Sequence, residues 1–149
     1  MKSAMCKLLA TDSSLAALIA RITVGVVMLP HGLQKTVGMF GGYGFSGTMG
    51  FLTGTVGLSS LVAFLVIIGE SLGALALIVG FFTRFCAASM AIIMIGAAKV
   101  GHLQNGFFMN WFGNQAGEGF EYHILVIGLC LSLVVSGAGK LSLDGKLSR

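Results

Sequence analysis

Residues 58–82 read LSSLVAFLVIIGESLGALALIVGFF, and Glu70 is the only charged residue among them. The stretch reaches the roughly 17 to 25 residues with which an α-helix crosses a bilayer. In lipid every backbone amide must be paired, so only helices and closed β-barrels span membranes. The stretch lacks the alternation of polar and apolar residues that is typical of barrel strands. It therefore predicts a membrane-spanning helix.

The composition extends this prediction to the whole chain. The 149 residues are 56% hydrophobic and only 9% charged, and the mean hydropathy is +0.95. A soluble domain of this length is far less apolar. We predict an all-α membrane protein with one domain over residues 1–149, a four-transmembrane-helix bundle. Its predicted spans are 15–35, 59–82, 84–102 and 121–138, of which the last two need their polar flanks to reach the required length.

The charges predict the orientation of the bundle. The formal net charge is +4, and most basic residues fall on one side of a four-span topology: Lys2, Lys7, Arg84, Lys140, Lys146 and Arg149. Cytoplasmic loops carry the excess of basic residues, so both termini are predicted to be cytoplasmic. The basic residues are interpreted as topology signals and contacts to membrane lipids rather than as ligands for nucleic acid. Lys2 and Lys7 before an apolar run also resemble a secretory signal, but no small-x-small cleavage pattern follows, so the first span is predicted to be retained.

The sequence contains no motif for a metal, haem, flavin or iron–sulfur cofactor. Its three cysteines, Cys6, Cys86 and Cys130, lack CxxC spacing and are interpreted as inert thiols. No HxxxH or ExxH spacing joins the histidines and glutamates, so we predict no metal site.

Two segments between the predicted spans are rich in glycine and aromatic residues. Residues 38–57, GMFGGYGFSGTMGFLTGTVG, contain enough glycine to weaken regular structure. We predict an interfacial or re-entrant segment at 36–58, although a flexible loop with aromatics at the headgroup level fits equally well. Loop 100–120 has the same character and offers four aromatic residues as interfacial anchors: Phe107, Phe108, Trp111 and Phe112.

Helical spacing brings polar residues to one face of each span. The first span carries a stripe at intervals of four, three, four and three residues, which predicts an inward packing face: Arg21, Gly25, Met28, Gly32 and Lys35. Pro30 removes a backbone donor and is predicted to kink this helix. On the fourth span we predict that the inward stripe starts at Glu121 and continues through Leu125, Gly128 and Ser132, with His123 to one side.

Glu70 lies roughly 16 Å below the outer end of its helix, near the bilayer midplane. A charge at that depth costs roughly 2.5 to 3.5 kcal/mol, so Glu70 must be paired or protonated. One interpretation is an ion pair with Arg21 or Lys35 that fixes helix register. The other is a polar pocket that opens to the outer side. Gly69 and Gly73 beside Glu70 form a small-xxx-small pair that favours close helix packing.

Further ionisable residues fall near the outer ends of the later spans. Arg84 and His102 are eighteen residues apart on the third span, so regular helical spacing predicts that they share a face. Lys35 and Lys99 are equally well explained as side chains that snorkel to the interface. His102 and Glu118 are equally well explained as ordinary loop residues.

The ordered set of these motifs resembles the DoxX family of small four-helix membrane proteins from residue 18 to residue 144. The resemblance rests on RITVGVVMLPHGLQK (21–35), ESLGALALIVGFFTR (70–84), KVGHLQNGFF (99–108), GFEYHILVIG (119–128) and SGAGKLSLD (136–144). These pieces contain Arg21, Lys35, Glu70, Lys99 and Glu121. Where many relatives have a proline before the second helix, this chain has VGLSS (56–60).

The resemblance implies a multi-pass protein of the bacterial inner (plasma) membrane that is linked to redox processes. Some DoxX relatives are subunits of a quinone-reducing sulfur-compound oxidase, and others associate with enzymes of thiol and oxidative-stress defence. We therefore expect a quinone-binding or accessory subunit of a membrane oxidoreductase, with quinone as cofactor. The expected partners are membrane lipids, an oxidoreductase subunit and further copies of the chain.

The expected roles of the site residues follow from their chemistry. Glu70 is expected to accept a proton, and His31 or His102 to donate a proton or a hydrogen bond to a quinone carbonyl. The remaining members of the predicted site would bind the ligand or balance its charge: Arg21, Lys35, Lys99 and Glu121. Two other functions stay open at this point, namely a transporter or channel for a small solute or proton, and a non-catalytic scaffold for partner proteins.

Overall fold

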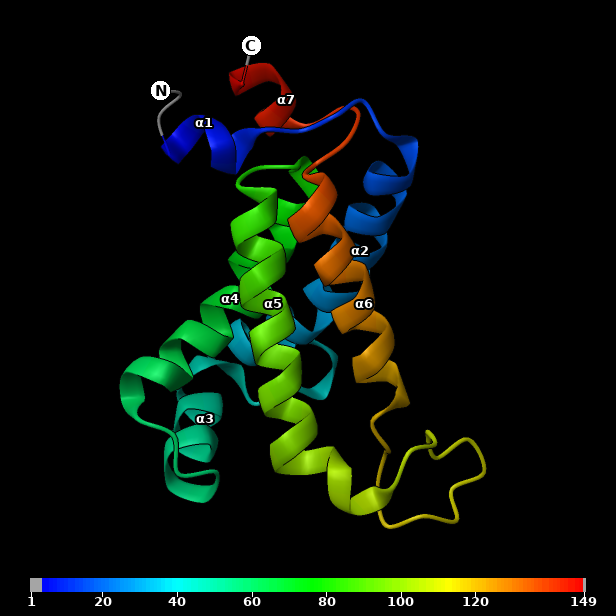
Figure 1. Cartoon of the computed structure of the whole chain (residues 1–149). Helices are drawn as coiled ribbons and strands as arrows, with labels where there is room; N and C mark the ends of the chain where they lie inside the picture. The colour runs from blue at the N-terminus through cyan, green and yellow to red at the C-terminus, as the bar shows by residue number, and fades with distance from the viewer. Residues whose placement is uncertain (1–3, 149) are drawn as a thin grey trace.

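Four apolar helices pack side by side in a computed structural model that describes residues 4–148 (Figure 1). They are α2 (Leu15–Thr36), α4 (Ser60–Val79), α5 (Thr83–Ala97) and α6 (Glu121–Ser136). Helix α2 contacts α4 and α6, and α5 also contacts α4 and α6, so the four helices close into a ring. The prediction of an all-α fold is confirmed for the described residues, which contain no strand.

Three helical segments are long and apolar enough to cross a membrane: Leu15–Thr36, Ser60–Val79 and Thr83–Asn105. The third joins α5 to η3 (Ala98–His102) and η4 (Leu103–Asn105). Helix α6 is equally apolar in character but has only 16 residues. Three membrane-spanning helices are therefore supported by length and composition, whereas the fourth span and the cytoplasmic termini stay predictions.

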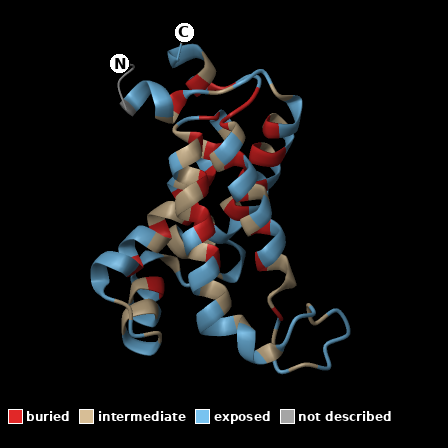
Figure 2. Ribbon diagram, in the orientation of Figure 1, coloured by how far each residue is buried: buried red, intermediate tan, exposed pale blue. Residues whose placement is uncertain are grey.

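The side chains sort by solvent exposure as expected for a bundle in lipid. Buried residues lie where the helices face one another, and the outer faces of the bundle are exposed (Figure 2). The core contains Val24, Met28, Leu77, Met90 and Leu133. Large apolar residues on the outer faces remain exposed, among them Leu61, Leu72, Ile92, Leu125 and Val135. Contiguous apolar surface of this kind is typical of contact with a membrane.

Side-chain caps define where the helices begin. The hydroxyl of Ser14 accepts a hydrogen bond from the Ala17 amide, and Ser59 caps α4 in the same way through Val62. Helix α5 is capped from far along the chain, because the buried Asp144 carboxylate accepts bonds from the amides of Phe82 and Thr83, both at 2.8 Å. The C-terminal segment therefore fixes the turn between α4 and α5.

Both ends of the described chain lie at one end of the bundle, where α1 (Ala4–Leu9) and α7 (Leu143–Leu147) cover it (Figure 1). The other end carries the two glycine- and aromatic-rich segments. This arrangement separates the basic end of the molecule from the aromatic end.

The glycine-rich segment at 36–58 is more regular than its composition predicts. It contains η1 (Met39–Gly41), α3 (Gly44–Gly50) and the π-helical turn η2 (Phe51–Thr55). Helix α3 packs against α2 and α4, which supplies the contacts that a glycine-rich helix needs. Gly38, Gly41 and Gly44 have positive φ values, so their conformational freedom serves the connections between the short helices.

Pro30 does not end the first helix. Helix α2 runs as one element from Leu15 to Thr36 with Pro30 inside it. Four of the five residues of the predicted stripe are buried, Arg21, Gly25, Met28 and Gly32, whereas Lys35 at its end is half-buried. No disulfide joins Cys6, Cys86 and Cys130.

Candidate functional site in the helix bundle

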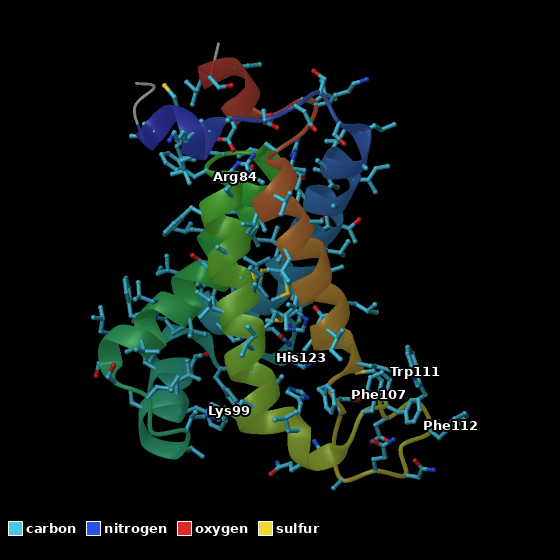
Figure 3. The ribbon with its side chains drawn as sticks, in the orientation of Figure 1. Arg84, Lys99, Phe107, Trp111, Phe112 and His123 are labelled. Atoms are coloured by element: carbon cyan, nitrogen blue, oxygen red, sulfur yellow. The ribbon has the colours of Figure 1, made fainter. Side chains whose placement is uncertain are left out.

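A cavity of about 320 Å³ lies between the four bundle helices, toward the end that carries the aromatic loops. Helices α2 and α4 form one wall, α5 and α6 the other, and loop 103–120 contributes its roof. Figure 3 shows His123 in this region, between α5 and α6. The lining residues are Met28, His31, Lys35, Glu70, Met94, Ala97, His102, Met109, Glu118, Tyr122 and His123.

An ion pair joins two helices in the wall of the cavity. Lys35 Nζ lies 2.6 Å from Glu70 Oε2, and the two side chains are 26% and 5% exposed. Pairing at this distance lowers the cost of burying the Glu70 carboxylate, and the partly exposed Lys35 keeps some contact with solvent. The predicted pairing of Glu70 with Lys35 is confirmed, and the alternative pairing with Arg21 is wrong.

Gly32 brings the two partners of this ion pair together. A Cβ atom at Gly32 would lie 2.4 Å from the Glu70 carbonyl oxygen and 2.5 Å from Ser71 Cα. Only glycine permits this approach of α2 to the backbone of α4. Lys35 follows Gly32 by almost one helical turn, so its ammonium group reaches the Glu70 carboxylate.

All three histidines of the chain line the cavity. The rings of His102 and His123 lie 4.3 Å apart between centroids, with 47° between their planes. His102 Nδ1 is 2.9 Å from the Glu118 backbone oxygen, which can only accept, so Nδ1 donates this hydrogen bond. Nε2 of a neutral His102 is then left as an acceptor.

His123 is 5% exposed, and its Nδ1 has no hydrogen-bond partner among the described residues. A buried polar atom without a partner costs roughly 1 to 3 kcal/mol. Ring contacts with His102 and with Tyr122 hold the imidazole in place. His123 is therefore packed between two rings while its Nδ1 lacks a hydrogen-bond partner among the described residues.

The remaining residues that line the cavity are mostly apolar, and the methionines among them have flexible, polarisable side chains. Met28, Met94 and Met109 contribute thioethers, and the Tyr122 hydroxyl donates a hydrogen bond to Met28 Sδ at 3.3 Å. Thioether sulfur is a weak acceptor, so this hydroxyl can exchange it for a better one. A flat ring with polar edges matches such a surface, because methionine and aromatic side chains pack well against rings.

Two glutamates fix the roof of the cavity. The Met109 amide donates to Glu121 Oε1 at 2.9 Å, and the Asn110 amide donates to Glu118 Oε2 at 2.6 Å. Met109 therefore lines the cavity on a loop that is tied to the start of α6. No group of three His, Cys, Asp or Glu residues able to hold a metal ion occurs within residues 4–148.

The family model described as DoxX matches residues 16–103, which is more than half of the chain. The chain belongs to the DoxX family. "Inner membrane protein YphA" of Escherichia coli (strain K12) is 28% identical over 130 residues, covering 85% of this chain and 86% of the relative. "Putative oxidoreductase CatD" of Bacillus subtilis (strain 168) is 30% identical over 130 residues, covering 87% of this chain and 85% of the relative. No solved structure matches.

Four of the seven predicted site residues line the cavity of this DoxX protein: His31, Lys35, Glu70 and His102. Lys99 does not, because it is exposed on the outside of the third segment (Figure 3). Glu121 holds the Met109 amide instead of lining the cavity. Its predicted inward stripe is wrong, since Leu125, Gly128 and Ser132 are exposed and the buried face of α6 begins at His123.

Arg21 lies at the opposite end of the DoxX bundle, near the chain termini. It is 1% exposed and donates to five backbone carbonyls, those of Leu77, Ile78, Ala138, Lys140 and Leu141. Arg84 also binds carbonyls at this end, those of Ala10, Val134 and Val135. Arg21 therefore holds residues 138–141 to the bundle, and Arg84 joins the start of α5 to Ala10 and to the end of α6.

The site predicted from the sequence lacks four residues that line the cavity: Met109, Glu118, Tyr122 and His123. The predicted stripe from Glu121 places His123 to one side of the inward face, and Glu118 is equally well explained by sequence as a loop residue. The adjacent Tyr–His pair at the start of the fourth span was the available signal. These residues and Met109 lie beyond residue 103, outside the part matched by the DoxX family model.

Proposed function

We propose that this DoxX protein is a quinone-binding or accessory subunit of a membrane oxidoreductase system, and that its cavity receives the quinone head group. The observation that carries the proposal is a mostly apolar, methionine-lined cavity that also contains an ammonium–carboxylate pair and two histidine rings in tilted contact. The cavity volume of about 320 Å³ lies at the lower end of the range for small-molecule sites, which suits one ring system.

The lining groups match the two kinds of surface that a quinone offers. Its carbonyl oxygens accept hydrogen bonds, and Lys35 has two further N–H donors beside the one directed to Glu70. His31 can donate a hydrogen bond to a quinone carbonyl, and Nε2 of His102 can accept one from a hydroxyl of the reduced form. Glu70 is the proton acceptor of the proposal, and the thioethers flank the ring. The bound quinone would supply the redox chemistry, and a partner subunit would exchange electrons with it.

The location of the cavity suits a ligand that is dissolved in the membrane. We further propose four spans in the inner membrane with both termini cytoplasmic, so that the cavity opens toward the outer side. Basic residues at the terminal end of the bundle favour this orientation: Lys7, Arg84, Lys140 and Lys146. The oxidoreductase name of the Bacillus subtilis relative agrees with a redox role.

The proposal predicts that the ion pair is needed for binding. Glu70→Gln and Lys35→Met should each lower quinone affinity by at least about tenfold, which corresponds to about 1.4 kcal/mol. The double variant should fold as well as the wild type, since replacing a whole buried pair by neutral groups is often harmless, and yet should not regain binding. A ubiquinone or menaquinone titration of the detergent-solubilised protein, followed by calorimetry, measures the affinity.

Lys99→Met is the matched control, because it removes an exposed charge from the same end of the bundle without touching the cavity. It should bind quinone like the wild type. Wild-type affinity in both Glu70→Gln and Lys35→Met would exclude the cavity as the quinone site.

A proton or small-solute transporter is the second candidate function. It is favoured by the series of ionisable groups that line one cavity: Lys35, Glu70, His102, Glu118 and His123. Such intramembrane groups are typical of proton relays. Flux into proteoliposomes distinguishes the two functions, because a redox subunit should support none. Scaffolding of partner proteins would instead be lost in Gly73→Leu, where the helix surface is open, and kept in the cavity variants.

A further inference from the structure

We infer that loop 106–120 is a membrane anchor whose exposed aromatic tip lies in the lipid interface at the outer boundary of the bilayer. This inference is independent of the quinone proposal. It concerns the surface of the loop that faces away from the cavity, where Phe108, Trp111 and Phe112 are exposed. Figure 3 shows Trp111 and Phe112 on the side of the loop that points away from the helices.

The loop is closed at its base, so its tip is presented in a fixed way. Backbone amides of Gly119, Phe120 and Glu121 donate to the carbonyls of Phe108, Gly106 and Phe107 at 3.2, 3.2 and 2.9 Å. The Phe107 ring packs edge-on against Phe120, with 5.5 Å between ring centroids.

Hydrogen bonds inside the loop fix the residue before the tip. Asn110 exchanges bonds with Gln115, one through its side-chain oxygen and one through its side-chain nitrogen. The Asn110 amide is also bound by the Glu118 carboxylate. Trp111 and Phe112, which follow Asn110, therefore project from a turn that these hydrogen bonds hold in one conformation.

Aromatic exposure at this tip is high. Trp111 is 79% exposed and Phe112 is 90% exposed. Burying a large apolar side chain stabilises a protein by roughly 1.5 to 3 kcal/mol, so two such rings in water would forgo a considerable gain. Exposed apolar surface of this kind is typical of contact with lipid or with another molecule.

Three observations indicate that the aromatic tip contacts lipid. Trp111 follows Asn105, the last residue of a membrane-length helix, by six positions and so lies close to the bilayer boundary. Residues 103–117 contain no charged side chain, which suits the interface and would be unusual for a protein-binding rim. The other glycine- and aromatic-rich segment, which contains the exposed Phe40 and Tyr43, lies at the same end of the bundle (Figure 1). Tryptophan and tyrosine are enriched at this depth in membrane proteins.

The anchor has a consequence for the cavity. Met109 and Glu118, which line the cavity, belong to the same loop as the exposed tip. The membrane surface would then hold the roof of the cavity from outside while Glu118 and Glu121 hold it from inside.

The experiment uses Trp111 as its own probe, because the chain contains a single tryptophan. The full chain is reconstituted in phosphatidylcholine vesicles whose acyl chains are brominated either near the carboxyl end or near the methyl end. We expect Trp111 fluorescence to be quenched strongly by bromine near the carboxyl end, weakly by bromine near the methyl end, and little by aqueous iodide.

Two control probes in a Trp111→Phe background calibrate the result. Leu72→Trp, exposed on the outer face of α4, should be quenched best by bromine near the methyl end. Ser148→Trp, exposed at the terminal end, should be quenched by iodide alone. Iodide quenching of Trp111 without bromine quenching would overturn the inference by placing the loop in water. Protection from both quenchers would overturn it in favour of a covering protein chain, and sedimentation would then show self-association.

Discussion

Arg21→Met is expected to lower the free energy of unfolding by about 3 to 5 kcal/mol, the range typical when one side of a buried charged network is removed. The guanidinium group joins α2 to the end of α4 and to residues 138–141 through its five hydrogen bonds to backbone carbonyls. Without it these carbonyls lose their donors inside the bundle. Equilibrium unfolding in mixed micelles, followed by circular dichroism, measures the change.

Two further variants define the cause of this effect. Lys140→Met removes an exposed charge from the same end and should leave stability within about 0.5 kcal/mol of the wild type. Arg21→Lys keeps the charge but lacks the planar fork of donors, so it should remain clearly destabilised. Wild-type stability in Arg21→Lys would mean that the charge matters rather than the hydrogen bonds. Folded Arg21→Lys protein should bind quinone normally, because Arg21 is remote from the cavity.

Gly32→Ala is expected to damage both the fold and the candidate site. Its Cβ would collide with the backbone of Glu70 and Ser71, which cannot move as a flexible side chain can. Overpacking of this kind costs roughly 1 to 3 kcal/mol. The helices must separate, so the contact between Lys35 and Glu70 lengthens and ligand affinity falls. Thermal unfolding and the quinone titration together measure the two effects.

Gly73→Ala is the matched control for this prediction. A Cβ at Gly73 would have no heavy atom within 4 Å, although both glycines lie inside membrane-length helices. Alanine there should be neutral or slightly stabilising, since it has the better helix propensity. Equal stability loss in the two variants would show that helix propensity or membrane insertion, rather than the α2–α4 contact, decides the outcome.

The helices and the inward face of the first span could be predicted from the sequence because they depend on local spacing. The stripe from Arg21 to Lys35 follows the helical period, and its buried members agree with it. The pairing of Glu70 was also accessible, since a carboxylate at mid-helix needs a partner and few cations were available.

The remaining parts of the site depend on tertiary contacts that spacing does not encode. Glu121 follows a helical stripe, yet its carboxylate binds a loop amide twelve residues earlier in the chain. Arg21 looks like a pocket cation in sequence, but it binds two carbonyls at the end of α4 and three more in residues 138–141, near the C-terminus. The short helices of residues 39–55 form on a glycine-rich stretch because α2 and α4 provide a surface for them.

The π-helical turn at Ala98–His102 has an evolutionary implication. Such a turn holds one residue more than the α-helical turn that it replaces, and it often marks a functional site. The extra residue sets the direction of His102 relative to Met94 and Ala97, which line the cavity one turn earlier. A purely α-helical segment of the same sequence would place His102 on a different face of the third segment. Gain or loss of one residue here during evolution would therefore affect the histidine pair even where His102 itself is retained.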